Sequence, residues 1–337
     1  MAKHDALFPI FNERVPSTLA HRAATAPLDS SGCLTEYRPL ESRSILSRVV
    51  SNRGLPFTHA INPYRGCEFA CRYCYARYTH EFLDKTPEDF EHKIYFKQNA
   101  AWLLKQELKR LPLDTAISIG TATDPYQPIE RRQKLTRSIL EVFAQTSGFR
   151  LGVVTKSPLI LRDLDVLIEI AQRHKLTIHH TVTTVDHRLA RILEPRAPRP
   201  DLRIAAVARL RREGLRSGVM CSPLMPGITD SRRSIAAVAK AASEADASFL
   251  HAGPLFLKPC SLPTFFDFVG QHFPEQLDSY KHRYAQRAFV SPEYAKRVQD
   301  LVQSICREYK LGSRYAESPA TNPAEAVAVI QARLPFS

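Results

Sequence analysis

The stretch INPYRGCEFACRYCYAR, residues 61 to 77, decides the fold of this chain because it gathers three cysteines directly after an apolar run. Cys67, Cys71 and Cys74 lie within eight residues, so three thiolates can converge on one centre. Thiolates are soft ligands that suit iron–sulfur clusters or zinc. A 4Fe-4S cluster held by three cysteines leaves one iron without a protein ligand, and that iron is then a reaction site. The alternative at this spacing is a Cys3His zinc site completed by His80 or His92.

The chain after this stretch alternates short apolar runs with amphipathic stretches, a pattern typical of βα units around a parallel sheet. Six runs are expected to be strands: Thr58 to Asn62, Ala116 to Gly120, Arg150 to Thr155, Thr177 to Thr183, Ser217 to Ser222 and Ser248 to Leu255. Five stretches between them are expected to be helices: Asn99 to Arg110, Arg132 to Thr146, Leu161 to His174, Leu202 to Gly214 and Ser231 to Glu244. Six βα units predict an open or partial (β/α)6 barrel, with function at the C-terminal ends of the strands.

Segments of different composition flank this predicted core, residues 57–256. Residues 1–56 are rich in Ser, Pro and Arg and are expected to form an irregular extension with at most a short strand or helix. Residues 257–318 are aromatic and basic, with a helix expected from Pro292 to Tyr309, and are predicted to cap the open end of the barrel. Residues 319–337 form an Ala- and Pro-rich tail with one short amphipathic stretch.

Composition narrows the class of protein. The 337 residues include 47 Lys and Arg against 34 Asp and Glu, a net charge of +13, and 44% are hydrophobic, which excludes a disordered chain. No apolar run is long enough to span a membrane, and Glu13 and Arg14 interrupt any secretory signal, so we expect a soluble, cytoplasmic protein. The other four of the seven cysteines are scattered, which argues against a disulfide framework. No glycine-rich nucleotide-binding motif occurs.

The cysteine loop resembles the hallmark of the radical S-adenosylmethionine (SAM) superfamily, a C-x3-C-x2-C loop after the first strand with an aromatic residue, here Tyr73, before the third cysteine. Within that superfamily the chain is similar to the spore photoproduct lyase-like (SplB-like) proteins, often catalogued as DNA repair photolyases, over about residues 40 to 310. The segments that carry this similarity are NPYRGC with CRYCYAR, GTATDPYQPIE (120–130), VVTKSPLILRDLD (153–165), EPRAPRPDLR (194–203) and GVMCSPLMPGITD (218–230). The resemblance implies that a 4Fe-4S cluster cleaves SAM to a 5'-deoxyadenosyl radical, which abstracts a substrate hydrogen.

The resemblance also implies roles for individual residues. Cys67, Cys71 and Cys74 would ligate the cluster. Tyr73 would pack near the adenine of SAM. The remaining SAM contacts would be Thr121, Thr123 and Asp124 toward the methionine part, Lys156 toward carboxylate or ribose groups, and Thr183 toward the ribose. Glu194, Arg196 and Arg203 would organise the loop after the fourth strand, either by binding substrate or by pairing with each other.

Two departures from the family pattern limit the reaction. The usual GGE triplet is absent. The lyase returns a hydrogen to its product from a cysteine in the second-strand loop, where this chain has Thr121 and Ala122. Cys221, at the end of the fifth strand, is the candidate replacement, and inert packing is the alternative for a lone buried cysteine. The radical step is therefore expected, whereas repair of a thymine photoproduct is not.

The basic residues of the chain suggest which kinds of partner it binds. Nine arginines lie between His187 and Arg216, and further Lys and Arg alternate with tyrosines in the predicted cap, a mixture that suits nucleic-acid backbones and bases. An electron donor such as flavodoxin or ferredoxin is implied by the resemblance. The alternatives that stay open are a radical enzyme acting on a peptide or small metabolite, and a zinc-stabilised, non-catalytic nucleic-acid-binding protein.

Overall fold

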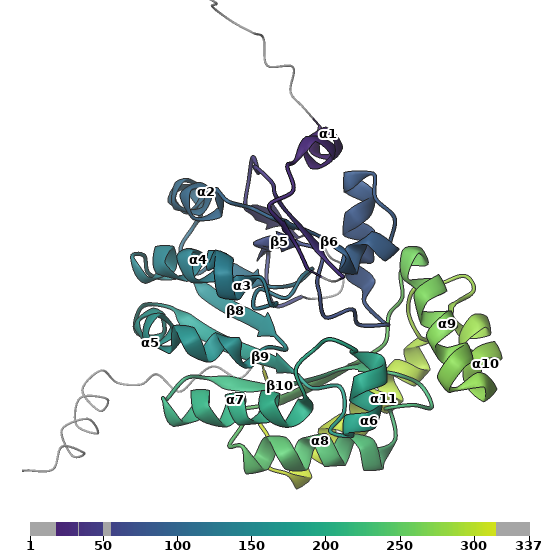
Figure 1. Cartoon of the computed structure of the whole chain (residues 1–337). Helices are drawn as coiled ribbons and strands as arrows, with labels where there is room; N and C mark the ends of the chain where they lie inside the picture. The colour runs from purple at the N-terminus through teal and green to yellow at the C-terminus, as the bar shows by residue number, and fades with distance from the viewer. Residues whose placement is uncertain (1–17, 33, 50–54, 315–337) are drawn as a thin grey trace, which may run out of the picture.

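A curved sheet of seven strands organises the chain in a computed structural model, which describes residues 18–32, 34–49 and 55–314 (Figure 1). The strand order is β11-β10-β9-β8-β7-β4-β3. Neighbouring strands from β4 to β11 are all parallel. These six parallel strands are β4 (His59–Ile61), β7 (Ala116–Ile119), β8 (Arg150–Thr155), β9 (Lys175–Thr181), β10 (Ser217–Leu224) and β11 (Leu250–Pro254). Each lies on one of the six predicted runs, so the partial (β/α)6 barrel is confirmed.

Helices cover the outer face of this sheet, as Figure 1 shows for α2, α4, α5 and α7. The helices between the strands are α2 (Ala100–Glu107), α3 (Glu130–Gln133), α4 (Leu135–Ala144), α5 (Leu164–Arg173), α6 (His187–Leu193), α7 (Pro200–Arg212) and α8 (Arg232–Glu244). Short 3-10 helices add η1 (Tyr75–Leu83), η2 (Glu88–Glu91), η3 (Leu108–Arg110) and η4 (Pro158–Asp163). The five predicted helices are all present. Apolar side chains from the outer face of the strands, such as Leu151 and Ile178, pack with Leu140 and Ile170 of the helices into one core.

The inner face of the sheet lines the barrel lumen and keeps access to solvent. Along β8 and β9 fully buried residues alternate with half-buried ones, and the half-buried set includes Val154 and His179. On β10 the half-buried residues Met220 and Ser222 alternate with buried Val219 and Cys221. His179 is in register with Gly218, and Met220, two residues farther along β10, is in register with His251. Residues in register, and residues two apart on one strand, share a face of the sheet, so His179, Met220 and His251 all line the lumen.

The N-terminal extension is more regular than the sequence indicated. It contributes α1 (Leu19–Thr25), β1 (Ser30–Ser31), β2 (Glu36–Pro39) and β3 (Leu46–Arg48). Strand β3 pairs antiparallel with β4 and extends the main sheet. A second sheet, with order β1-β2-β6-β5, combines the extension with β5 (Tyr64–Arg65) and β6 (Lys93–Phe96). The sequence missed these strands because each has four residues or fewer. Residues 1–17 lie outside the described part.

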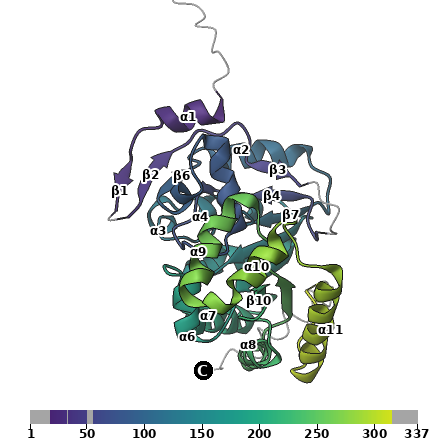
Figure 2. The same ribbon diagram turned by 90° about the vertical axis from the view of Figure 1, so that its right-hand side faces the viewer.

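The C-terminal segment divides into two parts (Figure 2). The first comprises η5 (Pro259–Ser261), α9 (Leu262–His272), η6 (Pro274–Gln276) and α10 (Leu277–Tyr284), and η5 contacts η1 beside the cysteine loop. The second is α11 (Pro292–Glu308), which packs against β11 and α8. The predicted cap, residues 257–318, thus also contains α11, a helix that lies against the last strand of the barrel. The predicted tail, residues 319–337, lies outside the described residues.

The aromatic residues of the C-terminal segment and the lengths of the helices also bear on the predictions. The aromatic residues expected to offer stacking surfaces are largely core, since Phe265, Phe268, Tyr280 and Tyr284 are each at most 4% exposed. Within the described residues, no helix combines the length and apolar character needed to cross a membrane.

Candidate radical SAM site

The cysteine loop begins where β5 ends, and its backbone is fixed at both ends. Gly66 has φ +84°, and a Cβ there would lie 2.7 Å from the Phe90 carbonyl oxygen, so only glycine fits. The Cys67 amide donates to that same carbonyl at 2.9 Å. Farther along the loop, the Arg72 amide donates to the Leu193 carbonyl of α6 at 2.9 Å. The loop is thus held between η2 and α6.

A buried ion pair supports the loop from behind. Arg77, 1% exposed, places its guanidinium 2.5 Å from the Glu91 carboxylate and donates to the Cys71 carbonyl at 3.4 Å. Neither residue was predicted from the sequence to belong to the site. The position of Arg77, three residues after the last cysteine, could have indicated such a pair, because an arginine so close to a buried loop needs an acidic partner.

The three thiols form a donor set that fits a multi-iron cluster. Cys67 and Cys71 are 9% and 8% exposed, and Cys74 is half-buried. Burial raises the pKa of all three thiols, that of Cys71 to about 12, and neighbouring cysteines contribute to the raised pKa of Cys67 and of Cys71. Soft thiolates favour iron–sulfur centres, and each cysteine thiol gives up its proton when it binds iron.

The zinc alternative finds no fourth ligand here. His80 is fully buried, and its Nε2 lies 2.9 Å from the Lys93 carbonyl oxygen. His92 places its Nδ1 2.7 Å from the Leu34 carbonyl oxygen. Within the described ranges, no three His, Cys, Asp or Glu side chains converge on a point that could hold a single metal ion.

The loop after β7 packs directly on the cysteine loop. The Thr123 hydroxyl donates to the Gly66 carbonyl at 2.6 Å, and the Tyr75 hydroxyl donates to the Thr121 carbonyl. Asp124 accepts bonds from the Thr155 hydroxyl and the Lys156 amide, both at 2.7 Å. The polar side chains of Thr123 and Asp124 thus join the ends of β7 and β8 to the cysteine loop.

A charged network links the other predicted residues. Buried Glu194 accepts bonds from the hydroxyls of Tyr73 and Thr183, and its other oxygen lies 2.6 Å from Arg203. Burial alone would raise the pKa of Glu194, but the charges of Arg203 and Lys156 outweigh it, so the net pKa is lowered. The Lys156 ammonium lies 5.8 Å from the centre of the Tyr73 ring. Five residues from four segments therefore meet beside Cys71.

The structure does not bring every predicted residue into this network. Arg196 donates to the Glu91 carbonyl at 3.2 Å and does not join the pair formed by Glu194 and Arg203. Cys221, 1% exposed, alternates with the lumen residues of β10, and its sulfur lies 3.7 Å from the Thr183 carbonyl oxygen. Cys306 of α11 contributes to the raised pKa of Cys221, about 12, after burial itself. The Cys221 thiol therefore lies toward the helices and away from the lumen.

Family membership follows from comparison with known proteins. Residues 61–238 match the sequence profile of the radical SAM superfamily. The chain belongs to the radical SAM superfamily. This radical SAM protein is 32% identical over 289 residues to "Uncharacterized protein Rv2578c" of Mycobacterium tuberculosis (strain ATCC 25618 / H37Rv), covering 85% of each chain. It is 30% identical over 172 residues to "Uncharacterized protein MJ0683" of Methanocaldococcus jannaschii, covering 51% of this chain and 62% of that one.

Solved structures of spore photoproduct lyase share the fold. The lyase complexed with dinucleoside spore photoproduct has a TM-score of 0.62 at 18% identity, covering 81% of this chain and 79% of the lyase. A mutant lyase with bound AdoMet and the same dinucleoside has a TM-score of 0.59 at 18% identity, with 80% and 78% covered. Because residues 61–238 match the radical SAM superfamily, this protein is an enzyme whose cofactors are a 4Fe-4S cluster and SAM. The zinc-stabilised binding protein is excluded as an interpretation.

Proposed function

We propose that this radical SAM enzyme abstracts hydrogen from a nucleic-acid substrate. Its net charge of +13 supports a polyanionic partner. Spore photoproduct lyase, which has the same fold, has been solved in complex with dinucleoside spore photoproduct. When bound, the cluster and SAM supply a 5'-deoxyadenosyl radical, so the chain's own residues have to bind, orient and shield the reactants.

We assign Cys67, Cys71 and Cys74 to the cluster. Lys156 suits the SAM carboxylate because its ammonium lies among Cys71, Tyr73 and Glu194 at the C-terminal end of β8. Tyr73 and Thr183 are held by Glu194, so that carboxylate positions both side chains. Thr121, Thr123 and Asp124 would shape the methionine pocket, mainly by fixing the loop that forms its wall.

The end of the reaction differs from that of a thiol-dependent lyase. Thr121 and Ala122 provide no thiol in the second-strand loop. Cys221 is packed away from the lumen, and we do not assign it a catalytic role. We infer that any hydrogen returned to the product comes from another source.

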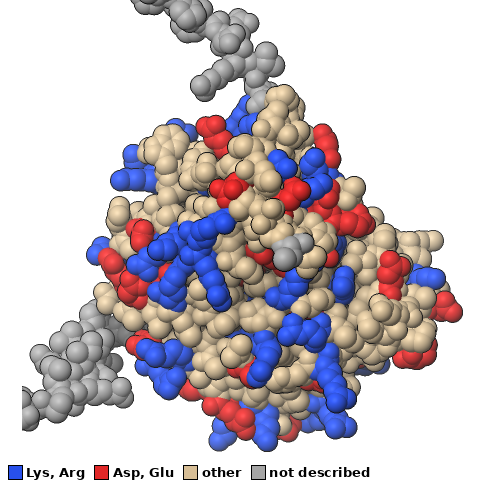
Figure 3. Space-filling model, viewed as in Figure 1, with Lys and Arg blue, Asp and Glu red and all other residues tan. Residues whose placement is uncertain are grey.

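The exposed arginines support the proposal only in part. Figure 3 shows Lys and Arg gathered over the lower part of one face, where α6, α7 and α8 lie, with acidic residues among them. Several are engaged in ion pairs: Arg199 with Asp201, and Arg209 with Glu213. Their net contribution to binding a polyanion is therefore smaller than the sequence alone indicated.

A small anionic metabolite is the second candidate substrate. The lumen carries His179, whose buried Nδ1 has no hydrogen-bond partner, within range of the charges of Arg216 and Arg314. A cationic lumen suits a carboxylate or phosphate small enough to enter the barrel. The buried aromatic residues of α9 and α10 also leave fewer surfaces for stacking bases.

One experiment separates these candidates. The enzyme is reconstituted anaerobically with iron and sulfide, and SAM, dithionite and perdeuterated oligonucleotides are added. Deuterium in 5'-deoxyadenosine, lost when Cys71→Ala replaces the cluster ligand, would support a nucleic-acid substrate. 5'-Deoxyadenosine that forms without deuterium from any DNA or RNA would contradict it and direct the search to small anions or peptides. A flavodoxin or ferredoxin in place of dithionite tests the proposed electron donor.

A further inference from the structure

The segment that joins α10 to α11 is strongly basic. Residues 281–297 hold five Lys and Arg against one acid, Glu293, a net charge of +4. Arg287 and Arg297 are exposed, and Arg283 is half-buried. We call Arg283, Arg287 and Arg297 the basic rim. A concentration of positive charge of this kind suits a polyanion.

This segment is fixed to the C-terminal ends of β10 and β11. The Tyr280 hydroxyl donates to the Pro226 carbonyl at 2.6 Å, and the Tyr284 hydroxyl donates to the Leu255 carbonyl at 2.8 Å. Pro226 comes shortly after β10, and Leu255 directly follows β11. The cysteine loop packs on the loop after β7, which leaves the sheet at this same end. The basic rim therefore lies at the mouth of the barrel, where the radical site is.

Aromatic contacts connect the segment to the cysteine loop. Tyr75 follows Cys74, and its ring centre lies 4.7 Å from that of Phe256. Phe256 stacks in turn on Phe289, with the ring centres 5.0 Å apart. Phe289 is two residues after Arg287. One stack of aromatic rings thus joins the segment that carries the rim to the loop that carries the cluster ligands.

Tyr294 holds two of the three arginines. The guanidinium carbons of Arg283 and Arg297 each lie 5.1 Å from the centre of the Tyr294 ring, so both groups are gathered around one side chain. The Tyr294 hydroxyl donates to Asp230, in the loop after β10, at 2.6 Å. A guanidinium held beside a ring by cation–π attraction retains N–H donors, which suit phosphate oxygens.

The charges of the rim are available to a ligand. Within residues 18–32, 34–49 and 55–314, none of its three arginines lies within ion-pairing distance of a carboxylate. The pKa of Glu293 is lowered mainly by hydrogen bonds at the start of α11, with a smaller contribution from Arg287. Arg199 and Arg209, in contrast, each pair with an acid nearby in the sequence. The rim therefore offers more uncompensated charge than those arginines do.

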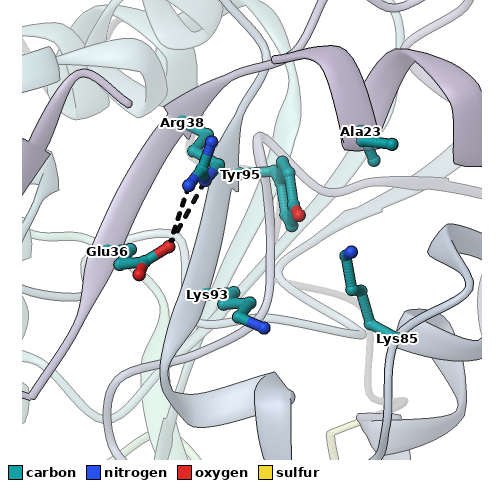
Figure 4. Close-up of a pocket in the computed structure, with 7 residues that line it drawn as sticks. Ala23, Glu36, Arg38, Lys85, Lys93 and Tyr95 are labelled. Carbon is teal, nitrogen blue, oxygen red and sulfur yellow. Dashed lines mark hydrogen bonds and ion pairs between the residues drawn. The ribbon is translucent and has the colours of Figure 1, made fainter. Parts of the chain in front are cut away.

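The cations near α1 are less suited to hold a substrate. A hollow of about 120 Å³ lies between α1 and the second sheet, and Figure 4 shows Lys85, Lys93 and Arg38 around it. Arg38 pairs with Glu36 at 3.1 Å, and Lys93 pairs with Asp89 at 3.0 Å. The opposite face of this sheet packs through an apolar core on the segment after β7. The hollow is therefore turned away from the barrel, unlike the basic rim.

We propose that the basic rim binds the phosphodiester backbone of a nucleic-acid strand and holds that strand across the mouth of the barrel. The strand is unpaired at this point, because enzymes that do chemistry on a base act on a single strand or take the base out of the stack. The choice of a nucleic acid rests on the proposed function, whereas the choice of surface rests on the position and charge of the rim. The rim supplies affinity without reading sequence, because phosphate contacts position a strand and base contacts specify it.

The test is a binding measurement on the reconstituted enzyme with SAM bound. A labelled 12-nucleotide single strand is titrated at several salt concentrations against the parent enzyme and the double variant Arg283→Gln with Arg297→Gln. We expect the variant to bind about tenfold more weakly and to lower the slope of log K against log salt by about 1.4, or about 0.7 for each lost phosphate contact. The variant Arg283→Lys with Arg297→Lys keeps the charge and should retain the slope of the parent.

The matched control is Arg150→Gln with Arg173→Gln. It removes the same charge from two half-exposed, paired arginines at the start of β8 and the end of α5, which is the opposite end of the barrel. This control should bind the strand as the parent does. Melting temperature and iron content, measured for every variant, show whether a loss of binding reflects a loss of folding.

Equal losses in the rim variant and the control, an unchanged slope in the rim variant, or no salt-sensitive binding by the parent would overturn the proposal. A mononucleotide or inorganic phosphate that competes as well as the oligonucleotide, at equal phosphate concentration, would assign the rim to a free phosphate and refute the backbone. The two proposals fail separately. Strand binding through the rim without hydrogen transfer would remove only the proposed function, and hydrogen transfer with unchanged binding in the rim variant would remove only this site.

Discussion

Replacing Arg203 by Met tests whether the buried pair with Glu194 holds the SAM pocket together. Both side chains are at most 2% exposed, and 2.6 Å separates the guanidinium from the carboxylate. Arg203→Met leaves the Glu194 carboxylate buried beside Tyr73 without its main counter-charge, which costs about 3–5 kcal/mol. Near the midpoint, the free energy of unfolding of a chain of this length falls by about 0.7 kcal/mol per degree of heating, so a loss of about 3–5 kcal/mol should lower the melting temperature by about 4–7 °C.

The assay is thermal unfolding of the reconstituted enzyme followed by circular dichroism. Arg209→Met is the matched control, because Arg209 lies on the same helix and pairs with Glu213 at 2.9 Å while half exposed. Its loss should cost under about 1 kcal/mol. Adding Glu194→Gln to Arg203→Met should restore part of the stability, since the stranded charge is then gone. Equal melting temperatures for Arg203→Met and Arg209→Met would refute the assignment of a stabilising role to the buried pair.

Three further predictions concern the site and its surroundings. Cys71→Ala should abolish cluster absorbance and 5'-deoxyadenosine formation, whereas Cys306→Ala, which removes a thiol of α11, should retain the iron content of the parent enzyme. Lys156→Met should raise the KM for SAM at least about tenfold if the lysine pairs with its carboxylate, and Lys175→Met, at the far end of the next strand, should leave KM unchanged. Lys97 has a lowered pKa of about 7, so above that pH the folded state loses a proton that the unfolded state keeps, and stability should rise with pH. In urea unfolding, the free energy of unfolding of the parent enzyme should be about 2–3 kcal/mol higher at pH 9 than at pH 7, and Lys97→Met should remove this difference. An equal pH dependence of the parent and the variant would contradict this reasoning.

The barrel was predictable because its strands are buried on the outer face and separated by long amphipathic stretches. Runs such as Arg150 to Thr155 and Ser217 to Ser222 carry enough β-branched or apolar residues to be recognised without partners. The second sheet was not predictable. Its strands are short, and β2 pairs with β6 across more than fifty residues, so nothing local in either segment identifies the other.

The candidate site likewise combines features that local sequence predicts with contacts that depend on the fold. The spacing of Cys67, Cys71 and Cys74 specifies a cluster loop by itself, because ligand spacing is a local property. The sequence offered Glu194, Arg196 and Arg203 as equal candidates for pairing or substrate binding. Only the helical geometry of α7 and the loop before it decides that Glu194 meets Arg203, while Arg196 points to the carbonyl of Glu91.

Both outer edges of the main sheet are covered by segments from beyond the predicted 57–256 core. Strand β3 pairs along β4, and Gly312 bridges to Phe249 beside β11, where Arg216 also donates to the Ser313 carbonyl at 3.0 Å. An uncovered edge of a parallel sheet is a template for pairing with another chain. A fragment trimmed to the barrel core would thus expose both edges of its sheet to pairing with other chains. In the full-length enzyme the short flanking segments cover these edges and should reduce aggregation.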